Sequence, residues 1–348
     1  MYKNQIVMDE KKKMTRKDFL RMGGSTIAGL SILGVAGTHL VKMFSDPGRM
    51  FYGDGGDDAA VRRADDLKSP YRKVSAFAVP SRIDALEVNG DDIYIAAGGN
   101  VSVYAADGTV KSSFPVKLSL RDIVFHDNRI YVLYPASVSV HDLSGAVVGG
   151  WEACSDESDY CQMTVFSEGV YVTDAQNKNI CRYSLDGGFR GFIASPDGFI
   201  VPSYSFGITN ISGKVYCSNP GRHRVEVYEA DGSFVKSFGR SGADDGGFSG
   251  CCNPVHLAAT PNGDIITSEK GVPRISCFGQ DGLFHAVLLD DLALGRGTSA
   301  REVRLKDDLL IVAGENDVSM FRYDPAFAES TACGGCVLNC PLRKGVNV

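Results

Sequence analysis

The sequence predicts an all-β fold in which six four-stranded antiparallel sheets close into a ring, a six-bladed β-propeller. A unit of four short strand-like runs recurs about every 37 to 50 residues between residues 80 and 324. Apolar residues come in short bursts between Asp-Gly and Asn-Gly turn signals, and 40 of the 348 residues are glycine. Units of this size bury their apolar faces by stacking around a common axis, so we expect one β domain without long helices.

The first copy of the unit shows its plan. Its four runs span residues 83–88, 92–96, 101–104 and 110–114. The sixth copy ends after its third run, near residue 324, and an unassigned strand-like run, 71–79, lies upstream of the first copy. We predict that this upstream run supplies the outer strand of the last blade and so closes the ring.

The units resemble NHL repeats over about residues 80–324. The match is clearest in residues 171–174 (Tyr-Val-Thr-Asp) and 224–228 (Arg-Val-Glu-Val-Tyr). Trp-Asp dipeptides are missing, which argues against WD40 and kelch repeats. Residues 250–254 and 267–274 are also similar to a group of exported bacterial NHL-repeat proteins. That resemblance implies a location and a scaffold, but little chemistry.

The N-terminal segment has the form of an export signal. A basic stretch precedes an uncharged, glycine-diluted apolar segment at 22–41, long enough at about 20 residues to cross a bilayer. Residues 15–21 (Thr-Arg-Lys-Asp-Phe-Leu-Arg) resemble the twin-arginine export motif, with Lys17 in place of the second arginine. No clear Ala-x-Ala site follows, so cleavage and retention as an anchor helix both stay open. The resemblance implies an exported protein, periplasmic or membrane-anchored and facing the periplasm.

The sequence therefore divides into four parts. These are a twin-arginine-like signal or anchor (1–45), a flexible Gly/Asp-rich linker (46–69), an NHL-type propeller (70–325) and a Cys-rich tail (326–348).

Charge distribution excludes one class of partner. Residues 1–45 hold 8 Lys/Arg against 3 Asp/Glu, which leaves 28 against 39 in the remainder. Because phosphate neutralisation dominates nucleic-acid affinity, an acidic body without a basic stripe argues against nucleic-acid binding. We expect membrane contact only through the leader.

Polar residues precede the predicted inner strands. NHL propellers include a zinc-dependent amidating lyase whose metal is held on the channel axis by His residues at these places. The corresponding residues here are Asp84, Asp122, Gln162, Gly207, His256 and Glu302. One His stands where three are needed, so the lyase is disfavoured. Asp84, Asp122, His256 and Glu302 remain candidates for an oxygen-rich cation site. We favour the alternative that they are solvated polar residues at a wet channel mouth.

The cysteines suggest several roles. Cys181, Cys217 and Cys277 fall inside strand patterns, where cysteine behaves as a small apolar residue. Cys154 and Cys161 flank an acidic loop, and in an exported protein a loop disulfide between them is the simplest expectation.

The tail carries Cys333, Cys336 and Cys340 with Cys-x2-Cys-x3-Cys-Pro spacing, similar to the end of bacterial ferredoxin cluster motifs. The resemblance implies a [4Fe-4S] cluster whose fourth ligand comes from elsewhere, with Cys251 or Cys252 as the natural candidates. Disulfides between the same tail and loop cysteines, or a zinc site with four thiolate ligands, are the alternatives.

Two functions follow from these features. The first is an exported, non-catalytic scaffold that binds a partner protein on a propeller face and carries a structural or electron-transfer cluster. It is favoured because no Ser-His-Asp, phosphate-loop or metalloprotease motif is present in the sequence. The second is a metal-dependent hydrolase or lyase with an axial metal in the channel.

Overall fold

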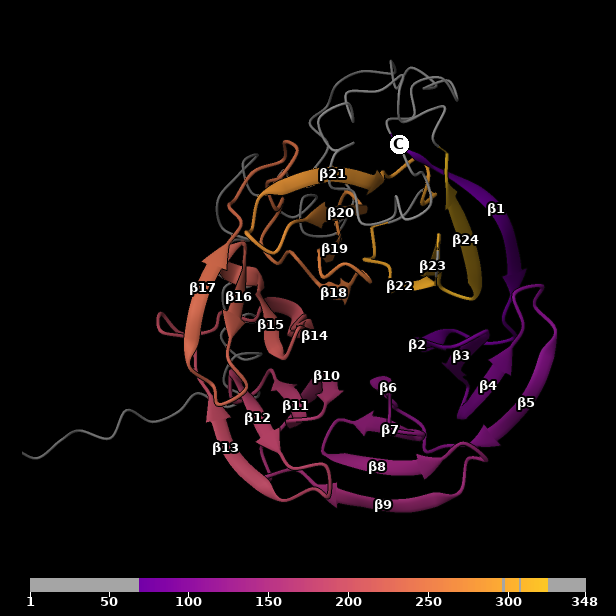
Figure 1. The fold of residues 1–348 in the computed structure, drawn as a ribbon, viewed down its shortest axis with the longest axis vertical. Helices are drawn as coiled ribbons and strands as arrows, with labels where there is room; N and C mark the ends of the chain where they lie inside the picture. Colours follow the sequence, from indigo (N-terminus) through magenta and orange to yellow (C-terminus); the bar gives the residue numbers. More distant parts are fainter. Residues whose placement is uncertain (1–68, 296–297, 307, 325–348) are drawn as a thin grey trace, which may run out of the picture. The chain divides into compact units, whose positions relative to one another are not determined.

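The computed structural model describes residues 69–295, 298–306 and 308–324. These residues form six four-stranded antiparallel sheets set around a common axis (Figure 1). The predicted six-bladed β-propeller is therefore confirmed.

Each blade is a sheet of four antiparallel strands. The first strand lies at the channel and the fourth at the rim. Blade one contains β2 (Ile83–Asn89), β3 (Asp92–Ala97), β4 (Asn100–Tyr104) and β5 (Val110–Pro115). Blade two contains β6 (Asp122–His126), β7 (Arg129–Tyr134), β8 (Ser137–Asp142) and β9 (Val147–Glu152). Blade three contains β10 (Tyr160–Phe166), β11 (Gly169–Asp174), β12 (Asn179–Tyr183) and β13 (Phe189–Ile193). Blade four contains β14 (Ile208–Ile211), β15 (Lys214–Asn219), β16 (Arg224–Tyr228) and β17 (Phe234–Phe238). Blade five contains β18 (His256–Ala259), β19 (Ile265–Glu269), β20 (Arg274–Phe278) and β21 (Phe284–Leu289). Blade six contains β22 (Val303–Lys306), β23 (Leu309–Ala313), β24 (Asp317–Tyr323) and β1 (Tyr71–Ala78). Short 3-10 helices, η4 (Pro202–Tyr204) and η5 (Pro220–Arg222), precede β14 and β16.

The ring closes by pairing the two ends of the domain. Strand β1 lies antiparallel to β24, with Tyr71 opposite Tyr323 and Ala78 opposite Asp317. The predicted closure is confirmed, because the upstream run is the outer strand of the last blade (Figure 1). The pairing extends beyond the strands, since the amide of Asp324 donates to the carbonyl of Pro70 at 2.8 Å.

The core lies between neighbouring blades. Every residue of β11 is buried, whereas β9 at the rim is exposed along most of its length. This gradient arises because the middle strands of a blade are covered on both faces by their neighbours. Between blades one and two, the fully buried side chains include Ala85, Ile123 and Val132. Each large aliphatic side chain buried in this way stabilises the fold by about 1.5–3 kcal/mol.

The predicted Asp-Gly turns connect the outer strands. Gly282 has a φ of 92°, in the left-handed region that favours glycine. A Cβ at this position would also lie 2.6 Å from the Cβ of Phe238 in the adjacent blade. Glycine is needed here both for the turn and for the close packing of one blade on the next.

The leader (1–45), nearly all of the linker and the tail lie outside the described residues, and so do Cys333, Cys336 and Cys340. Within the described part of the chain, no helix has the length and apolar character needed to span a bilayer.

Candidate functional site in the central channel

The six inner strands begin at the same end of the channel. Each position identified from the sequence directly precedes a buried residue of an inner strand. Those buried residues are Ala85, Ile123, Met163, Ile208, Leu257 and Val303. The alignment of the six copies on their inner strands is therefore consistent from blade to blade.

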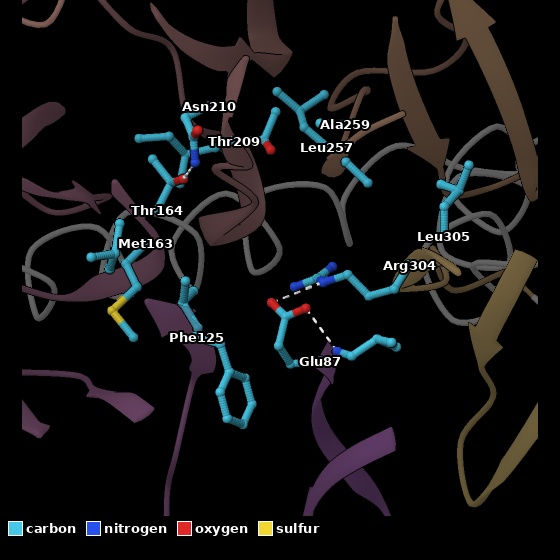
Figure 2. Close-up of a pocket in the computed structure, with 15 residues that line it drawn as sticks. Glu87, Phe125, Met163, Thr164, Thr209, Asn210, Leu257, Ala259, Arg304 and Leu305 are labelled. Atoms are coloured by element: carbon cyan, nitrogen blue, oxygen red, sulfur yellow. Dashed lines mark hydrogen bonds and ion pairs between the residues drawn. The ribbon is translucent and has the colours of Figure 1, made fainter. Parts of the chain in front are cut away.

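Two cavities lie along the channel. The first, which we call the mouth cavity, has a volume of about 420 Å³ and is lined by residues at the beginnings of the inner strands. The second, of about 280 Å³, is lined by residues further along the same strands, including Phe125, Met163 and Asn210 (Figure 2). The predicted site residues are divided between the mouth cavity and the region around Arg304.

Asp84 and His256 both line the mouth cavity. A register shift between Ile83 and Ala85 marks a β-bulge at Asp84, whose side chain is exposed there. Partial burial raises the pKa of Asp84, and the positive charge of Arg82 acts in the opposite direction.

His256 is held by a neighbour in blade three. The amide nitrogen of Gln162 donates a hydrogen bond to His256 Nδ1. Burial lowers the pKa of His256 to about 4, and the positive charges of Arg304 and Lys270 act in the same direction. The imidazole is thus neutral near pH 7, and because Nδ1 accepts from Gln162, its proton lies on Nε2, which can donate a hydrogen bond.

Asp122 and Glu302 belong to a different group, which surrounds Arg304. The Nη2 atom of Arg304 lies 2.9 Å from Glu302 Oε1 and 3.9 Å from Asp122 Oδ1. Its Nε atom lies 3.2 Å from Glu87 Oε2, and Figure 2 shows these two side chains facing each other in the channel. We call Glu87, Asp122, Glu302 and Arg304 the axial cluster.

Arg304 supplies the one positive charge of the axial cluster and offsets part of the charge of its three carboxylates. Burial raises the pKa of Asp122, the carboxylate of Glu302 acts in the same direction, and Arg304 opposes both. Burial also raises the pKa of Glu302, again against Arg304. For Arg304, burial disfavours the charge, but the three carboxylates outweigh it and raise the pKa of the guanidinium.

The carboxylates also accept backbone hydrogen bonds across blade boundaries. Glu302 Oε2 accepts from the amide of Leu86 at 2.9 Å, and Asp122 Oδ2 accepts from the amide of Met163 at 2.9 Å. Inner strands are sheet edges whose amides face the channel, so these side chains satisfy donors that lack a strand partner. Asp122 and Glu302 therefore have both a cation and backbone donors from the protein itself.

From the sequence, Arg304 and Glu87 were not identified as site residues. The prediction considered only the residue before each inner strand, whereas these two lie within the strands. Side chains two apart on a strand share a face, so the sequence spacing of Glu302 and Arg304 was the signal that could have identified the arginine.

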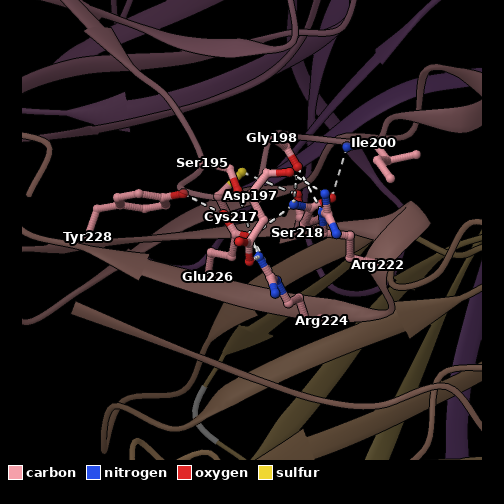
Figure 3. Close-up of polar contacts among 11 residues, drawn as sticks. Ser195, Asp197, Gly198, Ile200, Cys217, Ser218, Arg222, Arg224, Glu226 and Tyr228 are labelled. Carbon is pink, nitrogen blue, oxygen red and sulfur yellow. Dashed lines mark hydrogen bonds and ion pairs between the residues drawn. The ribbon is translucent and has the colours of Figure 1, made fainter. Parts of the chain in front are cut away.

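Another buried carboxylate lies in blade four, away from the channel cavities. Glu226 is fully buried and accepts hydrogen bonds from Ser195, Asn219 and Arg224 at 3.0, 2.8 and 2.8 Å (Figure 3). The hydroxyl of Tyr228 donates to its other oxygen. The Arg-Val-Glu-Val-Tyr pattern thus builds a fully paired network, which makes this a structural cluster rather than a site.

The described cysteines partly follow prediction. Cys181, Cys217 and Cys277 are buried core residues, as predicted. The predicted Cys154–Cys161 disulfide is wrong, since both thiols are free. Cys154 Sγ instead lies 3.4 Å from Cys181 Sγ, because β12 returns beside the loop that carries Cys154.

The loop before blade five places two further thiols together. Cys251 is exposed and Cys252 is buried, and their Sγ atoms lie 3.4 Å apart. The hydrogen bond with Cys252 raises the pKa of Cys251, burial adds to this effect, and Lys270 opposes it. The exposed thiol of Cys251 is the one open to a ligand approaching from solvent.

No known family and no curated protein matches the sequence. Solved structures do resemble the fold. They include virginiamycin B lyase from Staphylococcus aureus, with 11% identity, a TM-score of 0.52 and coverage of 72% of this chain and 99% of that chain. A streptogramin B lyase has 15% identity, a TM-score of 0.50 and coverage of 68% and 78%. A luciferin-regenerating enzyme has 11% identity, a TM-score of 0.54 and coverage of 72% and 94%.

The blades and the channel define this chain as a six-bladed β-propeller. At such low identity, the likeness to these enzymes extends to the fold alone.

Proposed function

We propose that this chain is a non-catalytic binding propeller that holds a partner protein on the face where the inner strands begin. The observation that carries this proposal is the mouth cavity, whose lining includes charges of both signs from Arg82, Asp84 and Arg121. Exposed apolar side chains accompany it on the same face. Leu118, Ile200 and Tyr204 are 75%, 45% and 48% exposed, respectively.

The loops on this face support the same proposal. Residues 194–207 and 239–255 connect successive blades there, whereas the connections on the opposite face are mostly tight turns, such as 127–128. Long loops on a rigid scaffold are the usual carriers of binding function. An exposed tyrosine beside a polar cavity is typical of a protein interface.

The axial cluster favours binding over metal catalysis at the channel centre. Arg304 pairs with Glu87 and Glu302, and backbone amides occupy further oxygens of Glu302 and Asp122. These carboxylates therefore already have hydrogen-bond and ion-pair partners within the protein. The alternative, a metal-dependent hydrolase or lyase, has less support. It rests on one observation, that Asp84 and a neutral His256 line the same cavity.

Site-specific photo-crosslinking tests the proposal. A photoreactive residue is placed at Leu118 or Tyr204 on the proposed face, and at Leu143 or Leu283 in turns on the opposite face as matched exposed controls. We expect one cross-linked adduct of defined mass from the first pair only. Equal yields from both faces would contradict the proposal. So would stoichiometric zinc or calcium that is lost in both Asp84→Asn and His256→Gln.

Export and a tail cluster stay part of the proposal. The twin-arginine-like leader supports export, and the spacing of Cys333, Cys336 and Cys340 supports an iron-sulfur cluster. The exposed thiol of Cys251 fits the role of a fourth ligand approached from solvent. Such a cluster would supply one-electron transfer or a structural tie. Anaerobic purification should give iron, acid-labile sulfide and a visible absorption band, whereas a colourless protein with oxidised tail cysteines would overturn the cluster.

A further inference from the structure

Three metal-ligating side chains meet in blade five, away from the mouth cavity and the axial cluster. Asp264 directly precedes β19, Cys277 lies in β20 and His285 lies in β21. One ligand atom from each lies within 4.8 Å of the other two. The antiparallel order β19-β20-β21 brings together residues that are up to 21 positions apart in sequence.

The separation between Asp264 and His285 fits a single small cation. Tetrahedral zinc with nitrogen, oxygen and thiolate ligands places its ligand atoms about 3.3–3.8 Å apart. His285 Nδ1 lies 3.6 Å from Asp264 Oδ2, which is within this range and beyond hydrogen-bond distance. Nδ1 of His285 is buried and has no hydrogen-bond partner among the described residues.

The corresponding positions of other blades show that this combination is not required by the fold. In blade one, Asp92, Val103 and Lys111 occupy these places, and the acid and the base form a surface ion pair. In blade four the places are taken by Lys214, Val227 and Val235, where a thiol and an imidazole are both absent. Blade five has Cys277 where blade one has Val103, and His285 where blade one has Lys111. Both replacements put a metal-ligating side chain where blade one has none.

We infer that Asp264, Cys277 and His285 bind one Zn²⁺ ion. A thiolate and an imidazole select a borderline metal such as zinc over calcium or magnesium, which prefer oxygen ligands. The side chains of Asp264 and His285 are 13% and 20% exposed, so water reaches the site from their side and completes the coordination. Binding deprotonates Cys277, forms the zinc–sulfur bond and releases one proton to solvent.

Cobalt titration of the full-length protein tests this site. After chelation, Co²⁺ should give a thiolate-to-cobalt charge-transfer band with one equivalent bound at this site, and Zn²⁺ should displace it. Cys277→Ala should lose that equivalent, while Cys217→Ala, which removes another buried strand cysteine, should keep it. Asp264→Asn and His285→Gln should each weaken binding at least tenfold, and Asp92→Asn should not.

The tail cysteines need a control of their own. A variant with Cys333, Cys336 and Cys340 changed to serine should retain the equivalent that depends on Cys277. The inference is overturned if the thiolate band disappears entirely in that variant, or if folded Cys277→Ala or His285→Gln binds cobalt like the unaltered protein. His285→Gln alters a partly exposed residue, so it decides the matter if Cys277→Ala does not fold.

Discussion

Glu302 Oε2 accepts a hydrogen bond from the amide of Leu86 at 2.9 Å, which ties the last blade to the first at the channel wall. Its other oxygen lies 2.9 Å from Arg304. Glu302→Ala removes both contacts and leaves a buried amide and part of a guanidinium unpaired. We expect the free energy of unfolding to fall by about 3 kcal/mol, measured by urea denaturation. Glu315→Ala, at an exposed position between two strands of the same blade, should change it by less than about 0.5 kcal/mol.

Arg304→Met should give a pH-dependent loss of stability. Without the guanidinium, the carboxylates of Glu87, Asp122 and Glu302 repel one another, and the raised pKa values of Asp122 and Glu302 rise further. The folded state then binds protons more readily than the unfolded state, so acidification restores stability. The deficit relative to the unaltered protein should be about 3 kcal/mol or more near pH 8 and clearly smaller near pH 5. A deficit that does not change with pH would contradict the charge balance described for the axial cluster.

His256 should destabilise the fold in acid. Its pKa is about 4 in the folded protein against an ordinary value of 6.5, so the unfolded chain takes up the proton first as pH falls. The free energy of unfolding should therefore decrease between these two values, by up to about 3 kcal/mol. NMR titration of the imidazole gives the pKa directly, and His256→Gln should flatten the pH dependence over this interval. A midpoint near 6.5 would show that the ring is solvated.

Glu226→Ala tests the network in blade four. The change leaves Arg224, Asn219 and Tyr228 without their shared acceptor in a buried site (Figure 3). We expect the free energy of unfolding to fall by about 3–5 kcal/mol. Glu229→Ala, three residues later, breaks only an exposed pair with Lys214 and should cost less than about 1 kcal/mol. Similar losses in the two variants would contradict the assignment.

Oxidation should join Cys154 to Cys181. Their Sγ atoms are 3.4 Å apart, whereas Cys161 Sγ lies 3.2 Å from the carbonyl oxygen of Tyr204. Prolonged exposure to oxidised glutathione, followed by peptide mapping, should yield the Cys154–Cys181 disulfide and raise the free energy of unfolding by about 3 kcal/mol. The reaction should be slow because burial raises the pKa of Cys181. Recovery of a Cys154–Cys161 peptide instead would show that the loop rearranges.

Local sequence patterns predicted the strands and their stacking because each blade repeats its own turns and apolar alternation. The closing role of β1 was also predictable, since one strand was missing at one end of the repeats and one was surplus at the other. Side-chain contacts between residues on different strands were not predictable. Cys154 was paired with the cysteine nearest in sequence, but the register of β12 brings Cys181 closer.

Contacts that depend on the closed ring and on strand register also explain why the sequence did not identify Arg304 and Cys277 as site residues. Arg304 lies within an inner strand, and only the ring brings its guanidinium near Glu87 from blade one. Cys277 fits an apolar strand position when its own strand is considered alone. Its proximity to Asp264 and His285 depends on three-strand register and on the bulges between β20 and β21.

The pairing of Tyr71 with Tyr323 has a consequence for how the protein is made and attached. A nascent chain cannot complete its last blade until residue 323 has left the ribosome, so any stop codon before β24 leaves β1 without a template. Whatever precedes residue 69 and whatever follows residue 324 also join the domain at adjacent points on one rim. A tag fused close to residue 69 would therefore start beside one fused close to residue 324.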